Sequence, residues 1–405
     1  MADLPVITIF GALNVQLQSR GPVPDVETRE LDCRCYSTDV DIWKILATDR
    51  PVAIVSFGTI EQFPRLLALP FNLRRRWLHF PHGTPLERVG AEAFHCFLTD
   101  ATTPREAPPL VTVFTPAYRT GERIHRPLRS LLAQSYSEWE WIVLDDSGDD
   151  GATFEMLNGI AATDSRIGVF RSHRQSGVIG EVKRQAAMLG RGSILVELDH
   201  DDELTVNGLA DIVGAFRAFP DAGFAYTDCA EVFEAGGNAT YPEGWGFGYG
   251  QTHEFIYQGR QYLAHRAPCI NSKTIRHIVS APNHIRAWKR DFYDEIGGHS
   301  PLLHVADDYE LCLRTFLHTR MIQVRTLGYI QYYNQTGNTQ RRRNKDIQRL
   351  VRTIQHAYES RIHERLLSLG VDDFAWNPTI GQIDWMTPNP EHEPHASLIF
   401  DPPKR

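Results

Sequence analysis

The chain has 405 residues, of which 42% are hydrophobic and 23% are charged, and its formal net charge is −8. This composition is typical of a globular protein of about two or three domains, and the negative charge argues against a protein that binds nucleic acid over its whole surface. No stretch reaches the roughly 20 apolar residues of a membrane-spanning helix, and the amino terminus lacks a basic segment followed by an apolar one, so no secretory signal is visible. We therefore expect a cytoplasmic protein with no transmembrane segment and no nucleic-acid partner.

Residues 1–105 are expected to form a small α/β accessory domain. Apolar runs at 6–10 and 52–55 are typical of buried strands, and the spacing of apolar residues over 42–47 indicates a helix. No group of residues in this region has the composition or spacing of a catalytic site. A polar, proline-rich stretch at 102–109 marks the end of this domain.

Between residues 110 and 340 the pattern changes to strands that alternate with helices, which predicts a doubly wound, mostly parallel α/β sheet. The expected strands are 111–115, 141–144, 167–170 and 194–198. Polar and acidic residues follow three of these strands, at the edge where such sheets bind ligands. They are Thr115, Asp145, Asp146, Asp199 and Asp201.

The stretch 194–202 concentrates negative charge at one point. An apolar strand, interrupted by Glu197, ends in Asp199, Asp201 and Asp202. Carboxylates packed this closely repel one another unless a cation lies among them. Mg²⁺ or Mn²⁺ is the expected cation, because both prefer oxygen ligands and commonly bridge carboxylates to phosphates. Acidic clusters also occur in ordinary loops, so the stretch alone leaves a plain turn open.

Several motifs, in order along the chain, resemble those of glycosyltransferase family 2, the inverting nucleotide-sugar transferases of GT-A fold. The segment 111–118 is similar to the opening strand of that family and its Pro-x-Tyr turn, and 141–150 resembles the family's IIVVDDGSxD motif. The segment 198–202 falls on LDxDD, and 296–298 with 307–311 resembles IGGF…EDxxL. The resemblance covers residues 111–340 and implies a metal-dependent transfer of a hexosyl unit from a UDP-sugar to an acceptor hydroxyl, with inversion.

The resemblance also implies a donor pocket at the strand ends. Its nucleotide-binding residues would be Thr115, Ala117, Tyr118, Asp145, Asp146, Lys183, Asp199 and His200. Asp201 would hold Mn²⁺ or Mg²⁺ against the diphosphate, where the cation offsets the charge of the leaving group. A carboxylate such as Asp145 or Asp146 can accept a hydrogen bond from the N–H that uracil offers, so UDP is the expected nucleotide. Without the resemblance, a turn would be the favoured interpretation for these two residues, and a solvated helix position for Lys183.

The same resemblance assigns the general base to Asp307 and Asp308. Asp308 matches the Asp of the family's acidic pair and is the first choice, with Asp307 as the second. Helical spacing after this pair predicts that it begins a helix, whose N-terminus favours an ionised carboxylate. Plain capping of the helix is the alternative.

Two further segments carry predictions. Residues 241–262 combine glycines with aromatic side chains, and we predict a lid in which Trp245 or Tyr249 stacks on a sugar; a glycine-rich excursion without function is the alternative. Residues 341–405 are expected to form an amphipathic helix, from about 344 to 370, and a proline-rich tail that is extended or disordered. The helix could pack on the transferase domain, contact the N-terminal domain or form a homodimer.

The processive-synthase motif QxxRW is absent and no membrane helices follow, which favours a single-transfer enzyme. Two other functions stay open. A nucleotidyltransferase shares the acidic strand end but needs a glycine-rich, cationic phosphate loop, and 120–123 is too sparse for one. A nucleotide-sugar-binding scaffold without catalysis is the second. The acceptor could be a glycan, a lipid-linked saccharide, a protein or a small molecule.

Overall fold

The chain divides into two compact units in the computed structural model. The first unit is Met1–Pro108 with Arg171–Gln175, and the second is Pro109–Phe170 with Ser176–Arg405. The residues that the structure describes are 6–10, 32–37, 40–49, 51, 53–67, 69, 76–85, 88–90, 92–93, 108–172, 175–242, 251–279, 282–334, 343–371 and 397–403.

The first unit is built on a parallel sheet of four strands in the order β2-β1-β3-β4. Its elements are β1 (Val6–Phe10), β2 (Asp32–Tyr36), α1 (Ile42–Asp49), β3 (Ala53–Phe57), the 3₁₀ turn η1 (Ile60–Gln62), α2 (Pro64–Leu67) and β4 (Trp77–Phe80). Buried apolar side chains of β1, β3 and β4 form its core, with Ile9, Val55 and Leu78 among them. The α/β character expected for this region is therefore confirmed.

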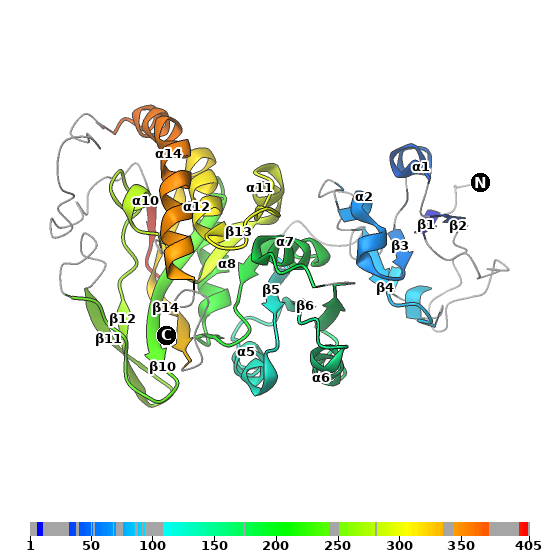
Figure 1. The fold of residues 1–405 in the computed structure, drawn as a ribbon, viewed down its shortest axis with the longest axis horizontal. Helices are drawn as coiled ribbons and strands as arrows, with labels where there is room; N and C mark the ends of the chain where they lie inside the picture. The colour runs from blue at the N-terminus through cyan, green and yellow to red at the C-terminus, as the bar shows by residue number, and fades with distance from the viewer. Residues whose placement is uncertain are drawn as a thin grey trace. The chain divides into compact units, whose positions relative to one another are not determined.

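The second unit is built on an 11-stranded sheet (Figure 1), counted over the residues that the structure describes. Its strands are β5 (Val111–Ala117), β6 (Trp139–Asp145), β7 (Ile167–Arg171), β8 (Ile194–Glu197), β9 (Glu203–Leu204), β10 (Phe224–Phe233), β11 (Thr252–Tyr257), β12 (Arg260–His265), β13 (Arg286–Lys289), β14 (Met321–Tyr333) and β15 (Ser397–Phe400). Its helices are η2 (Gly121–Ile124), α5 (His125–Leu132), α6 (Ala152–Ala161), α7 (Ile179–Leu189), α8 (Gly208–Ala218), α10 (Thr274–His277), α11 (Arg290–Glu295), α12 (Asp307–His318) and α14 (Asn344–Ser368).

The sheet of the second unit has a parallel part and a part that contains antiparallel pairs. The main order is β11-β12-β10-β13-β8-β5-β6-β7, and β14 pairs with β10, β9 and β15. β5 is parallel to both β6 and β8, as the alternation of strands and helices predicted. β13 then runs antiparallel to β8 and to β10. The α/β class is confirmed, and the parallel, helix-connected half of the sheet is the half that carries the predicted strand ends.

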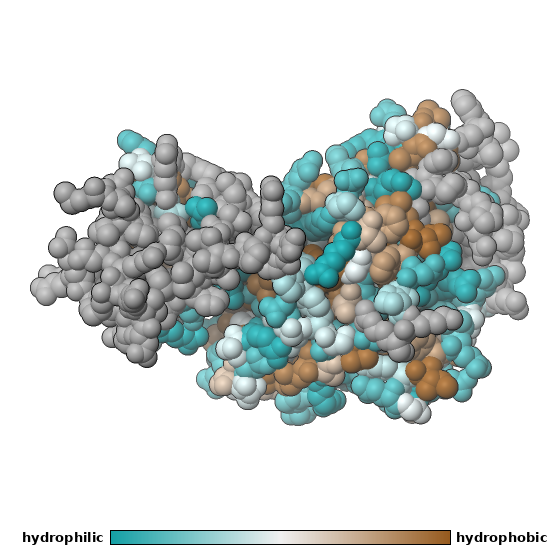
Figure 2. All heavy atoms as spheres, turned by 180° about the vertical axis from the view of Figure 1, so that it is seen from behind, coloured by the Kyte–Doolittle hydropathy of each residue, from teal (hydrophilic) through white to brown (hydrophobic). Residues whose placement is uncertain are grey.

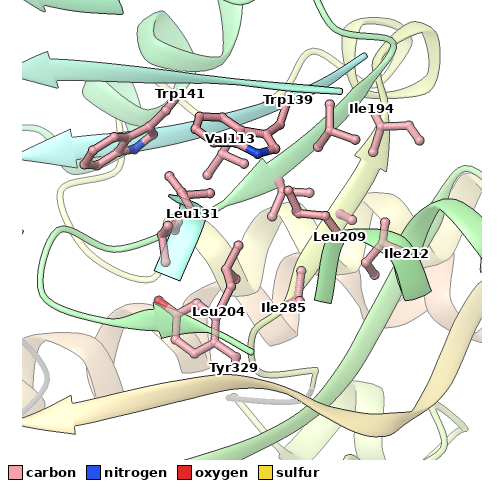
Figure 3. Close-up of a cluster of buried hydrophobic side chains, with 14 of the residues drawn as sticks. Val113, Leu131, Trp139, Trp141, Ile194, Leu204, Leu209, Ile212, Ile285 and Tyr329 are labelled. Carbon is pink, nitrogen blue, oxygen red and sulfur yellow. The ribbon is translucent and has the colours of Figure 1, made fainter. Parts of the chain in front are cut away.

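Side chains of the central strands alternate between two cores, as the period of a strand requires. In β5, Val113 enters one cluster with side chains of α5 and α8, whereas Phe114 enters the other cluster, which contains Val182 of α7. Figure 3 shows the first cluster, where Val113 and Trp139 of neighbouring strands lie near Leu131 and Leu209 of the helices. Helices therefore cover both faces of this sheet, and the strands between them are buried on both sides.

The C-terminal part of the chain packs on the second unit. α14 lies beside α12 (Figure 1), and Tyr358 Oη donates to Glu310 Oε1 at 2.5 Å. Arg276 Nη2 lies 3.0 Å from Glu359 Oε1. β15 pairs in parallel with β14, so this part of the expected extended or disordered tail is an ordered strand. The amphipathic helix therefore packs on the predicted transferase domain, which is one of the three partners that the sequence left open.

The surface of the second unit is mixed in polarity. On the face in Figure 2, hydrophilic and hydrophobic residues are interspersed. Large apolar side chains with high exposure come from separate elements, for example Ile256 of β11 and Leu302 in the segment before α12. None of the helices that the structure describes combines the length and the apolar character needed to cross a membrane.

Candidate active site

The C-terminal ends of β5 and β6 lie side by side at one edge of the sheet. Ala117 pairs in register with Asp145, and the backbone N–H of Asp146 donates to Ala117 O at 2.9 Å. His200, which follows β8, reaches the same edge, because its Nδ1 lies 3.4 Å from the backbone nitrogen of Tyr118. The structure therefore brings together five of the eight residues predicted to bind the nucleotide.

Both aspartates at the end of β6 are buried and hydrogen-bonded. Asp145 Oδ1 accepts from the backbone N–H of Ser147 at 3.0 Å and also from its hydroxyl. The carboxylate of Asp146 accepts from the backbone N–H groups of Ser176, at 2.6 Å, and Gly177, at 3.0 Å. Asp146 thereby ties the end of β6 to the segment that precedes α7. Contact of either carboxylate with a base stays a prediction.

Thr115 and Tyr118 differ in what they present to a ligand. The side chain of Thr115 is fully buried, and its hydroxyl accepts a hydrogen bond from Trp141 Nε1 at 2.8 Å. Tyr118 is 47% exposed, with the guanidinium of Arg119 5.4 Å from its ring centroid. Tyr118 is therefore the better placed of the two to stack on a base, and the role of Thr115 stays a prediction.

The three aspartates after β8 have separate environments. Asp202 is buried, and its carboxylate accepts from Tyr329 Oη at 2.9 Å and from the backbone N–H of Tyr332 at 2.7 Å. These bonds attach the turn to β14. Asp201 is only partly buried, and Asn334 Nδ2 lies 3.4 Å from its Oδ2. Asp202 thus acts on the fold, as a turn-shaping residue, while the Asp201 carboxylate is partly exposed.

Burial and nearby carboxylates make the end of β8 receptive to a cation. Burial raises the pKa of Asp201, and Asp199 adds to the increase. Burial likewise raises the pKa of Asp202 well above its usual range, with contributions from Asp201 and Asp199. A divalent cation beside Asp201 would relieve this repulsion, and carboxylate oxygens are ligands that Mg²⁺ and Mn²⁺ prefer. The residues at this point therefore fit such a cation.

A buried cluster of charges lies between β8, β13, α7 and the start of α12. Its centre is Glu197, which is fully buried. Lys183 Nζ lies 2.5 Å from Glu197 Oε1 and 3.5 Å from Asp307 Oδ2. Arg286 places Nη1 3.5 Å from Glu197 Oε2 and Nη2 3.0 Å from Asp308 Oδ2. One glutamate therefore links both predicted base candidates through two cations.

Two histidines complete this cluster. His284 Nε2 lies 3.4 Å from Glu197 Oε1, and its ring stacks on that of Tyr329 at 4.6 Å. His299 is fully buried, with its Nε2 3.9 Å from both Glu197 Oε2 and Asp307 Oδ2 and its Nδ1 2.7 Å from Tyr293 Oη. Burial lowers the pKa of His299 to about 3, so at neutral pH this histidine is uncharged.

The charge states in the cluster follow from opposed effects. Burial works against the charge of Lys183, but Asp307 and Glu197 raise its pKa well above the usual range. Burial also works against ionisation of Glu197, but Lys183, His284 and Arg286 hold its pKa well below the usual range. The two adjacent aspartates diverge. Burial raises the pKa of Asp307 to about 7, whereas at Asp308 the opposing effect of Arg286 holds the pKa below its usual value.

A second possible cation position has chemistry that argues against it. Glu197, Asp199 and His284 each offer a ligand atom, and these atoms lie within 4.8 Å of one another. Glu197 already contacts the positive charges of Lys183 and Arg286, which would repel a divalent cation at this point. This group is therefore a poor position for a divalent cation, and metal binding at Asp201 stays a prediction.

Lys183 differs most from its predicted surroundings. Only 5% of its side chain is exposed, and its amine is held by Glu197 and Asp307. Contact with a base or diphosphate stays a prediction. Glu197, Arg286 and the two histidines were missed from the sequence. The one available signal was Glu197 itself, a carboxylate within an otherwise apolar strand.

The predicted lid residues Trp245 and Tyr249 lie outside the described part of the chain. Among the described residues, a cavity of about 650 Å³ opens at the ends of β10 and β14. It is lined by Glu231, Phe233, Asn238, Ala239, Thr240, Tyr241, Tyr333 and Asn344. Glu231 accepts from Tyr333 Oη at 2.6 Å and from Tyr241 Oη at 3.2 Å. The cavity therefore combines aromatic faces with a buried, hydrogen-bonded carboxylate.

Residues 112–264 match the model of the family described as Glycosyl transferase family 2. This part, less than half of the 405 residues, is similar to glycosyltransferase family 2. It contains the ends of β5, β6 and β8, with Asp145, Asp199 and Asp201. The family expected from the motifs is thus confirmed, and Asp307 and Asp308 lie beyond the matched residues.

Curated relatives match shorter or longer parts of the chain. The putative colanic acid biosynthesis glycosyl transferase WcaA of Escherichia coli is 30% identical over 122 residues, which are 30% of this chain and 42% of the relative. The putative teichuronic acid biosynthesis glycosyltransferase TuaG of Bacillus subtilis is 35% identical over 95 residues, which are 24% of this chain and 37% of the relative. The uncharacterized protein y4gI of Sinorhizobium fredii is 26% identical over 226 residues, which are 55% of this chain and 22% of the relative. The chain spans less than half the length of each.

Among solved structures, S. aureus TarS 1-349 in complex with UDP-GlcNAc superposes with a TM-score of 0.46 at 17% sequence identity. The superposition covers 67% of this chain and 74% of that chain.

Proposed function

We propose that the protein is a metal-dependent, inverting glycosyltransferase that moves one hexosyl unit per reaction from a UDP-sugar to an acceptor hydroxyl. The observation that carries this proposal is the environment of Asp308, a partly exposed carboxylate paired with Arg286 at the first turn of α12. The family match of residues 112–264 supports the reaction class. A UDP-sugar donor is supported by a relative named as a UDP-Glc-dependent glucosyltransferase, WfgD of Escherichia coli, which is 31% identical over 100 residues, 25% of this chain and 38% of the relative.

Asp308 is the general base in this proposal. Its Oδ1 accepts from the backbone N–H of Tyr309 at 2.8 Å, its Oδ2 faces Arg286, and 31% of its side chain is exposed. An acceptor hydroxyl can therefore approach the carboxylate and give up its proton as the oxygen attacks the anomeric carbon. Asp307 has only 4% of its side chain exposed and lies beside Lys183 and His299, where no acceptor can reach it.

The donor binds at the strand ends in this proposal. Asp201 would hold Mn²⁺ or Mg²⁺, and the cation would supply positive charge to stabilise the departing diphosphate. Tyr118 stacks on the base, Asp145 accepts from it, and Asp199 lies toward the ribose. Lys183 affects the donor site only indirectly, through Glu197, because the Glu197 carboxylate holds its amine.

The cavity at Glu231 receives the acceptor. Aromatic side chains and hydrogen-bonding groups together suit the alternating apolar faces and hydroxyls of a saccharide. Tyr333 lines the cavity, and the residue that follows it in the chain, Asn334, contacts Asp201. A hydroxyl-bearing glycan, free or attached to a carrier, is therefore the proposed acceptor class.

Release of free UDP from a panel of UDP-sugars, with Mn²⁺ and without acceptor or with candidate saccharides, tests the proposal. We expect Asp308→Asn to lower turnover by about 10²–10⁴-fold. The matched control is Asp221→Asn, an exposed residue before β10 that belongs neither to the strand-end site nor to the cavity lining, and which should leave turnover unchanged. If no nucleotide sugar released nucleotide, a binding module without catalysis would be the better interpretation.

A further inference from the structure

We propose that Arg286 is a positioning residue for the transfer reaction, which aims the Asp308 carboxylate at the acceptor while Glu197 fixes Arg286 from the opposite side. The inference rests on the proposed function, because it concerns the general base of that reaction. Nothing in the family motifs includes Arg286 or Glu197, and both come from the geometry of the buried cluster.

The guanidinium of Arg286 is held at three points. Its Nε donates to Pro282 O at 2.9 Å, its Nη1 lies 3.5 Å from Glu197 Oε2, and its Nη2 lies 3.0 Å from Asp308 Oδ2. These partners come from the segment before β13, from β8 and from α12. Only 3% of the Arg286 side chain is exposed. A planar guanidinium group with partners on three sides is held in one orientation. It can therefore define the orientation of the Asp308 carboxylate that it contacts.

Asp308 has one further fixed contact. Its Oδ1 accepts from the backbone N–H of Tyr309, so each carboxylate oxygen has a partner. The lone pairs that remain point away from these two donors, and the exposed part of the side chain provides access to them. Rotation of the carboxylate would break both contacts. The arrangement therefore keeps the proton-accepting direction constant, which is the condition for efficient general-base catalysis.

Several titratable groups face Asp308 or its partner Arg286 from the surrounding elements. Lys183 of α7, Glu197 of β8, Arg286 of β13, His299 before α12, and Asp307 and Cys312 of α12 act on Asp308, and Asp199 and His284 act on Arg286. His299 is neutral, and the amine of Lys183 is shared between Glu197 and Asp307. Among the described residues, Arg286 is the cation in an ion pair with Asp308.

Loss of Arg286 would change the titration of the base in a defined direction. Burial and Glu197 raise the pKa of Asp308, whereas Arg286 and Lys183 lower it. Without the guanidinium, the effects of burial and Glu197 on the pKa of Asp308 are less opposed. Asp308 would therefore become protonated at a higher pH. The acidic limb of the pH profile of turnover would then move upward.

The experiment measures kcat and kcat/KM for UDP release against pH, with the best donor of the panel. For Arg286→Gln we expect the acidic limb to move up by about 1–3 pH units, the usual effect of an opposite charge at this range. Arg286→Lys should return the limb close to the wild-type position. Arg276→Gln is the matched control, since Arg276 is 2% exposed and its Nη2 lies 3.0 Å from Glu359 outside the site. The control should leave the limb in place.

Each outcome has a defined meaning. An acidic limb at the wild-type position in Arg286→Gln, or the same shift in Arg276→Gln, would overturn the inference while the proposed function stands. If Arg286→Gln does not fold, Arg286→Lys tests the inference instead. Its amine keeps the positive charge but cannot bridge two carboxylates. We therefore expect kcat to fall about tenfold or more, while the acidic limb of the pH profile stays at the wild-type position. Wild-type kcat in that variant would also overturn it. A wild-type chain without turnover on any donor would remove both proposals.

Discussion

Glu197 is a fully buried carboxylate in a strand whose other residues are apolar. Isolated charges in a protein interior are costly, and they persist where ion pairs and hydrogen bonds compensate them. Lys183 and Arg286 provide that compensation from α7 and β13. Arg286 is separated from Glu197 by 89 positions in the chain. No local pattern could have predicted this pairing, because it depends on how distant strands are ordered in the sheet.

Lys183 is predicted to be a stability residue. Lys183→Met leaves Glu197 and Asp307 without their shared cation, so we expect the free energy of unfolding to fall by about 3–5 kcal/mol. The double variant Lys183→Met/Glu197→Leu should recover part of this loss, since it removes the uncompensated charge. Urea denaturation followed by circular dichroism measures both. A single variant within about 0.5 kcal/mol of wild type, the range of ordinary surface substitutions, would contradict this role.

Asp201 and Asp202 are predicted to separate metal binding from stability. Asp201→Asn should weaken Mn²⁺ binding in the presence of UDP by about tenfold or more, since it removes an anionic oxygen ligand. Asp202→Asn should leave Mn²⁺ affinity intact but lower the free energy of unfolding by about 1–3 kcal/mol, because the buried N–H of Tyr332 or the hydroxyl of Tyr329 loses its acceptor. Calorimetric titration and chemical denaturation distinguish the two. The reverse pattern would show that the assignments are exchanged.

At the scale of elements, the first turn of α7 and the segment before α12 approach closely at Gly180. A methyl group at Gly180 would collide with Ser300 O and lie within 3.1 Å of Asp307 Cβ. Gly180→Ala should therefore lower both thermal stability and turnover, since it displaces the start of the helix that carries Asp308. Gly159→Ala in α6 is the control, because nothing lies within 4 Å of an added Cβ there. A helical alanine at that position should stabilise by about 0.5–1 kcal/mol.

Equal thermal midpoints and equal turnover in Gly180→Ala and wild type would show that the two elements can separate without cost. A drop in stability with unchanged turnover would place the α7 contact outside the machinery that positions the base.

Predictability differs between the two halves of the large sheet. β5, β6 and β8 are short apolar runs with helices between them, and they were recognised from the period of their residues. β10 is buried along nearly its whole length, so it shows no alternation of polar and apolar residues. Its pairing with β14 joins segments far apart in the chain. The strand-end carboxylates were therefore predictable, whereas the cluster around Arg286 of β13 required the structure.

At the scale of the molecule, every described residue with a proposed catalytic or donor-binding role belongs to the second unit. The first unit has its own sheet and its own apolar core. The sequence predicted a separate accessory region from its lack of catalytic motifs and from the proline-rich break that follows it. The chemistry of its surface determines what the first unit recognises. The periodicity of strands and helices carries no information about that surface.

A fragment of residues 109–405 is predicted to retain the donor reaction. It contains β5 to β15 with both cores of the large sheet, so burial sufficient for folding is kept. We expect cooperative unfolding and a kcat for UDP release within about twofold of the full chain, a difference of about 0.4 kcal/mol in activation free energy. Transfer to a large acceptor should weaken if the first unit binds that acceptor, and this would appear in KM rather than kcat. A folded fragment that releases no UDP would mean that the first unit contributes to the donor site itself.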